Sequence, residues 1–218
     1  MFLQSLEYIL MGTGVTVAVT LIALPFGFLL GLLLALVRVY GGRVAGYVVG
    51  FYSTTMRGIP PVVLLFIIYF IIAGSINISP FLAGSLALGI ISSAYQLEIF
   101  RGALQAVGAG QMMAARSIGM SRLQAIRHII IPQALRLAIP PWSNEAATVV
   151  KDSSLVYAIG VPEILRRAQF ISARTYRPFL AFTIAALIYF ALTFLTNRLL
   201  DFVEARTRIP SLHEMGEV

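Results

Sequence analysis

The sequence contains no cysteine and few charged residues. Without cysteine the chain can form no disulfide, no zinc–thiolate site and no cysteine nucleophile. Charged residues make up only 11% of the 218 residues, whereas about a quarter is usual for a soluble domain. Hydrophobic residues make up 59%, and the mean hydropathy is +0.89. These values place the chain among integral membrane proteins.

Acidic residues are fewer than basic residues, with 9 against 16. In a membrane protein such an excess of arginine reports orientation and contact with lipid headgroups. No basic stripe is interleaved with aromatic residues, so we expect no nucleic-acid partner. The N-terminus lacks the basic start and the small-residue cleavage site of a signal peptide, so we expect the first apolar run to stay in the mature chain.

Catalytic signatures are also missing. No glycine run ends in Lys-Ser or Lys-Thr, so we expect no ATP hydrolysis by this chain. The two histidines, His128 and His213, are too far apart in sequence to suggest a metal cluster or a catalytic dyad. We therefore predict that the chain is not an enzyme and holds neither a metal nor a cofactor of its own.

Five segments are predicted to cross the membrane, each near the roughly 20 residues that a span needs. They start at about 13, 44, 81, 129 and 178, and form one transmembrane domain over 13–208. A short amphipathic lead-in at 1–12 precedes them, and a disordered tail at 209–218 follows. An odd number of crossings, with arginines after the last one, places the N-terminus outside and the C-terminus inside. The sequence thus predicts an all-α integral membrane protein with five transmembrane helices.

Two of the five spans carry features unusual for lipid-facing helices. The second contains Arg57-Gly58-Ile59-Pro60-Pro61, and because proline removes a donor and restricts its neighbour, we expect a broken helix there. The fourth is interrupted by prolines and by charged residues, so it should be shielded by protein or line a wet cavity. Between the fourth and fifth spans, 153–178 carries four arginines and is too short of apolar residues to cross. We read this segment as a re-entrant or lateral helical segment that returns at the membrane surface, with contact to an external partner as one explanation of its charge.

The interval 110–128 is the longest without a membrane-like apolar run. It contains Arg116, Arg122 and Arg127 and no acidic residue, as expected of a cytoplasmic loop. Two interpretations are open: a basic helix resting on anionic headgroups, or a docking element for a soluble partner. The candidate docking residues are small or apolar, with one arginine: Ala114, Ala115, Arg116, Ile118, Gly119, Met120 and Leu123.

The order of residues in this loop resembles the EAA loop of binding-protein-dependent ABC importer permeases. Ala114-Ala115, then Gly119, then Ile129-x-Ile131-Pro132 match that loop's spacing throughout. Met113 stands where the family usually has Glu, and Ile131 where it has Leu. Further motifs are similar to the polar amino-acid branch of the family: Arg57-Gly58-Ile59-Pro60, Ala94-Tyr95, Glu98-Ile99-Phe100-Arg101-Gly102, Pro132-Gln133-Ala134, Asn144-Glu145 and Lys151-Asp152-Ser153-Ser154-Leu155.

The resemblance implies a type I ABC importer permease fold and a set of partners. Such subunits work as dimers in the cell membrane, here with a second and identical permease expected. Each subunit docks one ATP-binding cassette subunit through its cytoplasmic loop, and that partner binds ATP and Mg²⁺. A soluble extracytoplasmic binding protein delivers the substrate. The implied function is ATP-driven import of polar amino acids, with basic amino acids among the candidate substrates.

The intramembrane polar residues offer two interpretations. In the first they neutralise one another, Lys151 with Glu145 or Asp152 and Glu98 with Arg101. In the second they bind a zwitterionic amino acid at a helix break, where backbone donors hold its carboxylate. Glu163 is the best candidate for holding the ammonium group, because its only obvious local partners are Arg166 and Arg167. The full candidate set is Glu163, Ser153, Ser154, Asp152, Lys151, Asn144, Glu98 and Tyr95.

Two rival functions are compatible with the residues. A proton-coupled secondary transporter or channel would use Glu98, Glu145, Asp152 and Glu163 as a relay. A purely structural membrane subunit would have no translocation path, which the polar fourth span argues against. Dependence on ATP separates an importer subunit from a proton-coupled carrier.

Overall fold

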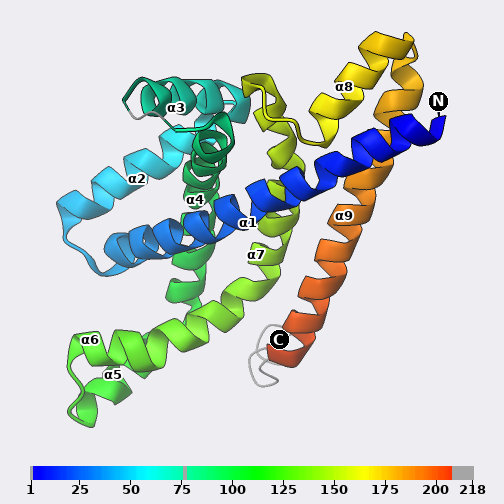
Figure 1. Cartoon of the computed structure of the whole chain (residues 1–218). Helices are drawn as coiled ribbons and strands as arrows, with labels where there is room; N and C mark the ends of the chain where they lie inside the picture. Colours follow the sequence, from blue (N-terminus) through cyan, green and yellow to red (C-terminus); the bar gives the residue numbers. More distant parts are fainter. Residues whose placement is uncertain (1, 76–77, 208–218) are drawn as a thin grey trace.

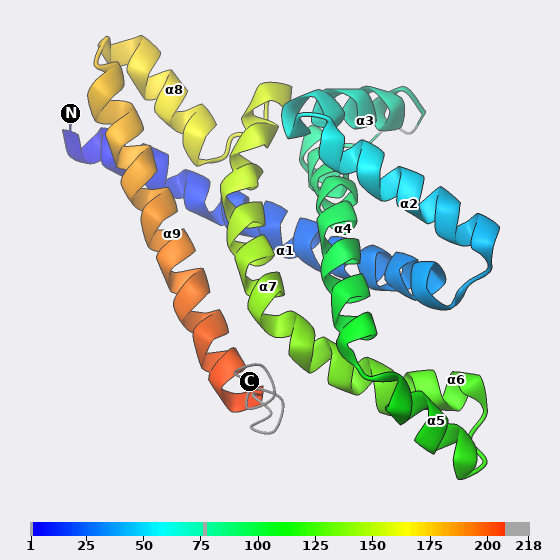
Figure 2. The same cartoon turned by 180° about the vertical axis from the view of Figure 1, so that it is seen from behind.

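A computed structural model of the chain describes residues 2–75 and 78–207 (Figures 1 and 2). The predicted tail at 209–218 lies outside these residues. Within them the chain is helical throughout, as predicted, and no strand is present. The elements in chain order are α1 (Phe2–Tyr40), α2 (Arg43–Gly58), α3 (Pro61–Ser75), α4 (Pro80–Ala106), α5 (Ala109–Ser117), α6 (Arg122–Ala125), the π-helical turn η1 (Ile126–Ile130), α7 (Ile131–Asp152), the 3₁₀ helix η2 (Ser153–Ile159), α8 (Ile164–Thr175) and α9 (Pro178–Thr207).

Three single helices, α1, α4 and α9, are long and apolar enough to cross a membrane. A fourth candidate is the pair α2 and α3, in which the chain bends by 115° at the break between them. The break falls at Ile59 and Pro60, which confirms the broken helix predicted there. Helix α7 has 22 residues but is not apolar enough to join this set on composition alone. Five crossings therefore remain a prediction, which requires α7 as the remaining span.

The first helix differs from the prediction at its start. No break separates 1–12 from the first span, because α1 runs without interruption from Phe2 to Tyr40. The segment predicted as a lead-in has an apolar face that packs against other helices of the protein. Ile9 is fully buried there, in a cluster with Ile164 of α8 and Ile184 of α9. The start of α1 is thus packed into the protein together with α8 and α9.

Helix α4 lies at the centre and is crossed by α1 (Figures 1 and 2). Two glycines of α1 permit this close approach of the two helices. A Cβ atom on Gly27 would lie 3.1 Å from the carbonyl oxygen of Gly89, and one on Gly31 would lie 3.0 Å from the backbone nitrogen of Leu97. Backbone-to-backbone contact of this kind replaces the hydrophobic effect as the source of helix association in lipid.

Helices α5 and α6 lie at the end of the molecule opposite α3 and α8, while α7 stands between α4 and α9 (Figure 1). The predicted lateral segment is helical, as η2 and α8. With 12 residues, α8 is too short to cross a bilayer. The polar helix α7 is covered by α4 on one side and α9 on the other, as expected of a helix unsuited to lipid.

Candidate functional site

The loop at 110–128 folds as two short helices joined by a left-handed turn. Helix α5 ends in a backbone motif in which Met120 donates to the carbonyl of Ala115 at 3.1 Å and Gly119 donates to that of Arg116 at 3.1 Å. Gly119 has φ = +87°, a conformation that costs a residue with a Cβ. A Cβ placed on Gly119 would meet nothing within 4 Å of it. Within the chain, Gly119 is therefore required by the left-handed backbone conformation of the turn and not by a lack of space.

Most of the candidate docking residues share an accessible surface. Ile118 is 79% exposed and Leu123 is 74% exposed. Ala114, Arg116 and Gly119 are also exposed, and Met120 is half-buried. Two large apolar side chains held open on a short cationic loop form a surface suited to a protein partner.

Ala115 does not belong to that surface. It is only 4% exposed, because it is on the face of α5 that packs against the protein itself. Its predicted role in docking is therefore corrected to a structural one. Its small side chain allows α5 to lie close to the helix that follows.

The loop is firmly attached to the rest of the molecule. Ser121 caps α6 in a reciprocal arrangement with Gln124, and Arg122 donates to the carbonyl oxygen of Tyr40 at the end of α1 at 3.2 Å. The backbone N–H of Ile131 bonds to Ile126, five residues back, and η1 thereby joins α6 to α7 without a break. A displacement of the docking surface would therefore be transmitted directly to α7.

A chain of hydrogen bonds links α7 to α4 inside the protein. Trp142 donates its indole N–H to Gln96 at 2.8 Å, Gln96 donates to Ser92 at 3.0 Å, and Ser92 donates to Glu145 at 2.6 Å. Gln96 also donates to the carbonyl of Leu24 in α1 at 3.4 Å, and is fully buried. One buried amide thus connects three helices.

A second group of polar contacts links α4 to α2. Glu98 accepts from Arg101 at 2.7 Å, which confirms the predicted ion pair, and from Ser53 of α2 at 2.8 Å. The hydroxyl groups of Tyr52 and Ser93 lie 2.6 Å apart. The carboxylate of Glu98 is thus held by one cation and one hydroxyl, and remains about one-fifth exposed.

One side of α7 carries the polar residues Asn144, Thr148 and Lys151, which we call its polar stripe. Asn144 and Lys151 are exposed and Thr148 is half-buried on the same side of the helix. Glu98–Arg101 is the one ion pair within 4 Å among the described residues. Mutual neutralisation is therefore confirmed for Glu98 and Arg101. Lys151 forms no ion pair within 4 Å with Glu145 or Asp152, although it interacts electrostatically with Asp152.

The end of α7 also differs from the expected helix break. The chain continues after Asp152 as the 3₁₀ helix η2, and the backbone N–H of Ser153 donates to the carbonyl of Val149. The buried Ser153 hydroxyl donates to Val150 at 2.7 Å. Both donors of Ser153 are consequently occupied, whereas Asp152 and Ser154 are half-buried. The freed backbone donors expected around Ser153 are absent because the helix tightens instead of ending.

Glu163 has a different environment from the one predicted. It is fully buried at the N-terminus of α8, where it accepts from the backbone N–H groups of Leu165 at 2.7 Å and Arg166 at 2.6 Å. The hydroxyl group of Tyr189 in α9 donates to the same carboxylate. The expectation that Arg166 and Arg167 are its only local partners is therefore wrong, since Glu163 caps α8 through two backbone N–H groups and joins it to Tyr189 of α9.

The candidate substrate residues consequently fall into two places. Tyr95 is half-buried and packs in a cluster formed by α1, α3, α4, α7 and η2, which includes Val149. Glu163 is flanked by Ile164, which belongs to the separate cluster of α1, α8 and α9. The structure brings Tyr95 together with the end of α7. Glu163 reaches that end indirectly, because the hydroxyl group of Tyr189 lies close to the side chains of both Glu163 and Ser153.

Sequence reasoning overlooked Gln96, Trp142, Ser92 and Tyr189. Gln96 follows Ser92 by four residues within an otherwise apolar span, and that spacing is the signal that a polar contact faces the interior. Tyr189 gives no such signal, since a tyrosine in an apolar helix is ordinary. Its pairing with Glu163 depends on contact between α8 and α9.

Comparison with known proteins shows which family the chain belongs to. Residues 27–209 match the family described as "Binding-protein-dependent transport system inner membrane component". The chain belongs to this family. As a permease of this type it is an α-helical, multi-pass inner membrane protein and a transporter component, not a catalytic enzyme.

Similar proteins narrow the kind of permease. The chain is 34% identical to a putative glutamine transport system permease protein, GlnP, of Rickettsia conorii, over 94% of this chain and 95% of the relative. It is 35% identical to the octopine transport system permease protein OccQ of Rhizobium meliloti, over 91% and 89% of the two chains. It is also 35% identical to the probable amino-acid ABC transporter permease protein YckA of Bacillus subtilis, over 87% and 84%.

Solved structures agree with this assignment. A crystal structure of an amino acid ABC transporter with histidines superposes with a TM-score of 0.81 at 38% identity, covering 92% of this chain and 94% of that one. The inward-facing MetNI methionine ABC transporter gives a TM-score of 0.81 at 20% identity, covering 93% and 97%, and supports the fold alone. The permease is thus the membrane subunit of an ATP-driven importer of amino acids, and nothing favours the proton-coupled alternative.

The capping role of Glu163 leads to a testable prediction. Glu163→Gln should lower the free energy of unfolding by about 1–3 kcal/mol, because an amide offers one acceptor oxygen to three donors. Thermal unfolding of the purified permease measures this, with the exposed Glu7→Gln as a matched control. Amino-acid uptake per folded molecule should be unchanged. Normal thermal stability combined with lost uptake would instead restore Glu163 to the substrate path.

Proposed function

We propose that this permease imports polar amino acids by coupling the movement of α7 to an ATPase subunit docked on α5 and α6. The observation that carries the proposal is the unbroken helical connection from Arg122 through η1 to Asp152. It joins an exposed apolar surface at one end to the most polar intramembrane helix at the other. Closure of an ATPase pair beneath the loop would tilt α7 as a rigid body and switch the cavity between two states.

The docking surface consists of Ala114, Arg116, Ile118, Gly119, Met120 and Leu123. Its apolar side chains suit burial in a groove of the partner, and its arginine suits an acidic rim. Met113 is 64% exposed beside them, and it would contribute apolar contact where the family usually has a carboxylate. In this proposal ATP and Mg²⁺ bind to the partner subunit, and the permease chain itself holds no cofactor.

Orientation follows from the charge of the loop. Arg116, Arg122 and Arg127 lie at the α5–α6 end, which we place in the cytoplasm. With α1, the α2–α3 pair, α4, α7 and α9 as five crossings, the N-terminus is outside and the C-terminus inside. The transmembrane domain at 13–208 then includes the loop at 110–128 as its coupling element. The end that carries α3 and α8 faces the extracytoplasmic binding protein, which delivers the substrate.

A second permease is proposed from the exposed polar stripe of α7. Asn144 and Lys151 are uncovered in the isolated chain, yet a polar helix at membrane depth must be covered by protein or water. A two-fold pair of identical subunits places the two stripes on either side of one wet pathway. A single chain leaves that pathway open to lipid.

The substrate site is proposed along this pathway, on α4 and α7. Lys151 supplies an unpaired cation for the carboxylate of the amino acid, and Asn144 supplies an amide. Glu98 is the accessible carboxylate for the ammonium group or for a basic side chain. Tyr95, Asp152 and Ser154 complete the proposed wall, whereas the buried and satisfied Ser153 and Glu163 support it from behind.

Docking can be tested by removing the two most exposed apolar side chains of the loop. The double variant Ile118→Ser and Leu123→Ser should weaken association with the ATPase subunit by at least about tenfold, since burying one such side chain is worth about 1.5–3 kcal/mol. Co-purification and titration of the ATPase measure this. His128→Ser, exposed in the same loop but outside the surface, serves as control. Unchanged association in the double variant would contradict the docking role.

The paired arrangement can be tested by cross-linking, because the chain has no native cysteine. A single Asn144→Cys should yield a covalent permease dimer with a short bis-maleimide, since a two-fold axis brings equivalent positions together. Leu199→Cys, 60% exposed on α9, should not react in this way. A transport-active preparation that yields monomers only from Asn144→Cys would rule out the facing arrangement.

The substrate site can be tested through Lys151. Lys151→Gln should weaken binding of radiolabelled glutamine or arginine to the purified transporter by about a hundredfold, because removing one partner of a desolvated charge pair costs about 3–5 kcal/mol. Arg198→Gln on α9 removes an equal charge away from the pathway and should have no effect. Equal binding by both variants would show that Lys151 lies outside the site.

A further inference from the structure

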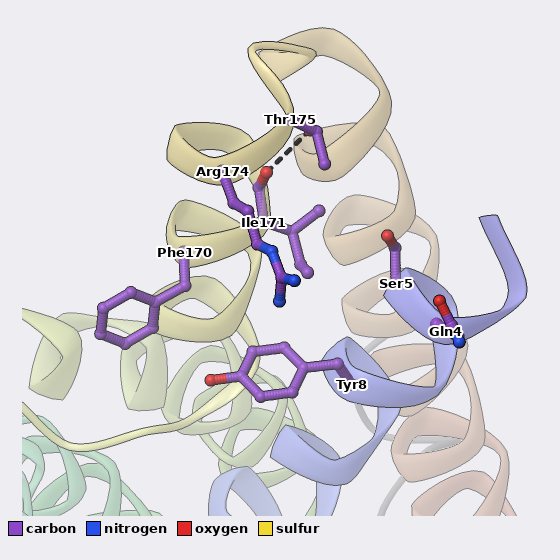
Figure 3. A pocket seen from close by; sticks show the side chains of 7 residues that line it. All are labelled: Gln4, Ser5, Tyr8, Phe170, Ile171, Arg174 and Thr175. Atoms are coloured by element: carbon purple, nitrogen blue, oxygen red, sulfur yellow. Dashed lines mark hydrogen bonds between the residues drawn. The ribbon is translucent and has the colours of Figure 1, made fainter. Parts of the chain in front are cut away.

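A pocket of about 590 Å³ lies between the first turns of α1 and the C-terminal half of α8 (Figure 3). Gln4, Ser5 and Tyr8 line it from α1, and Phe170 and Arg174 line it from α8. Figure 3 shows the guanidinium group of Arg174 pointing into the space between the two helices, above the ring of Tyr8. The pocket is thus a cationic cavity with polar groups on one side and an aromatic ring on the other.

Arg174 differs from the other arginines of α8 that contact neighbouring groups. Arg167 donates to the carbonyl of Pro162 at 2.9 Å and lies over the ring of Tyr8 at 4.8 Å. Arg166 lies over the ring of Phe170 at 5.0 Å. Among the residues that the structure describes, no carboxylate approaches Arg174 within 4 Å and its side chain makes no hydrogen bond. Arg174 is exposed to solvent where it lines the pocket, and an arginine without a paired anion is available to bind one there.

The surroundings of the pocket are apolar and aromatic. Tyr176 is 89% exposed and Phe179 is 85% exposed just beyond Arg174. On α1, Leu10 and Met11 are 46% and 56% exposed immediately after Tyr8. Exposed rings above an exposed aliphatic surface are typical of the level at which lipid headgroups meet the hydrocarbon core.

We propose that this pocket binds the phosphate group of a membrane phospholipid. The guanidinium of Arg174 would hold the phosphate through paired N–H donors, and the hydroxyl of Tyr8 and the amide of Gln4 would supply further donors. The acyl chains would lie along the exposed aliphatic surface of α1, next to Met11. A bound lipid would join α1 to α8, and it gives the arginine-rich segment a partner in the membrane itself. The proposal depends neither on the substrate path nor on the docking loop.

The aliphatic surroundings favour a lipid over an acidic protein. A docking surface for a soluble protein has a polar rim, whereas the pocket is flanked by Met11 and Phe179. The only acidic side chain in the first turns of α1 is Glu7, which forms no ion pair within 4 Å in the described chain. A phosphate diester linked to two acyl chains matches both the cation and the apolar flanks.

Native mass spectrometry of the full-length permease, purified with its partner subunits, tests the proposal. Titration with phosphatidylglycerol should leave one tightly retained lipid per permease chain. Arg174→Gln should weaken that retention by about tenfold, as expected for the loss of a charge-assisted hydrogen bond. Tyr8→Phe should cause a smaller loss. Arg177→Gln, which removes an exposed arginine outside the pocket, is the matched control and should behave as wild type.

Two probes separate a lipid from other anions. Diacylglycerol with the same acyl chains lacks the phosphate and should not be retained. Inorganic phosphate should neither bind measurably nor displace the lipid. Equal retention by Arg174→Gln and Arg177→Gln, retention of diacylglycerol, or binding of inorganic phosphate alone would each overturn the proposal. One further outcome would overturn the proposal. If Arg174→Gln retains lipid normally but the binding protein no longer stimulates ATP hydrolysis, the arginine belongs to a protein contact.

Discussion

The packing of this permease depends on one buried amide. Gln96 lies where Gly27 and Gly31 bring α1 against α4, and its hydrogen bonds reach Leu24 in α1 and Trp142 in α7. In hydrocarbon an unsatisfied amide costs several kcal/mol, so these partners must be in place whenever the three helices are assembled. The register of α1 and α7 against α4 is thereby fixed, and α2 and α3 are added around that core.

The loop at 110–128 is joined to α7 by continuous helix, so movement of the loop can be passed on to α7. Residues 122–152 form one continuous helical rod of about 45 Å at about 1.5 Å per residue, and the rod bends within α7 (Figures 1 and 2). A π-helical turn precedes Pro132, which has no N–H to give, and it keeps the rod continuous. Pro140 and Pro141 lie inside α7, where they remove backbone donors and favour a bend. A displacement at Ile118 and Leu123 would therefore reach Lys151 through a continuous but bent helix.

Some carboxylates of the chain hold helices together, whereas Glu98 remains accessible. Glu163 is enclosed by α8 and α9, and Glu145 is half-buried against Ser92, so both serve to hold helices together. Glu98 is paired but still reachable, and Lys151 has no ion-pair partner in the described part of the chain. Charge that the single subunit leaves uncompensated is the physical reason to expect a second subunit and a zwitterionic substrate between the two.

Sequence alone determined the membrane class, the all-helical fold, the break at Ile59 and Pro60 and the Glu98–Arg101 pair. Each of these follows from composition or from spacing within one helix. Tertiary structure decided that Glu163 caps α8 under Tyr189, because that contact joins residues 26 positions apart through the packing of two helices. It also decided that Ala115 faces inward, and that α7 tightens into η2 in place of ending. The local sequence pattern shows which side chains a helix presents, whereas the packing of the helices determines which partners those side chains contact.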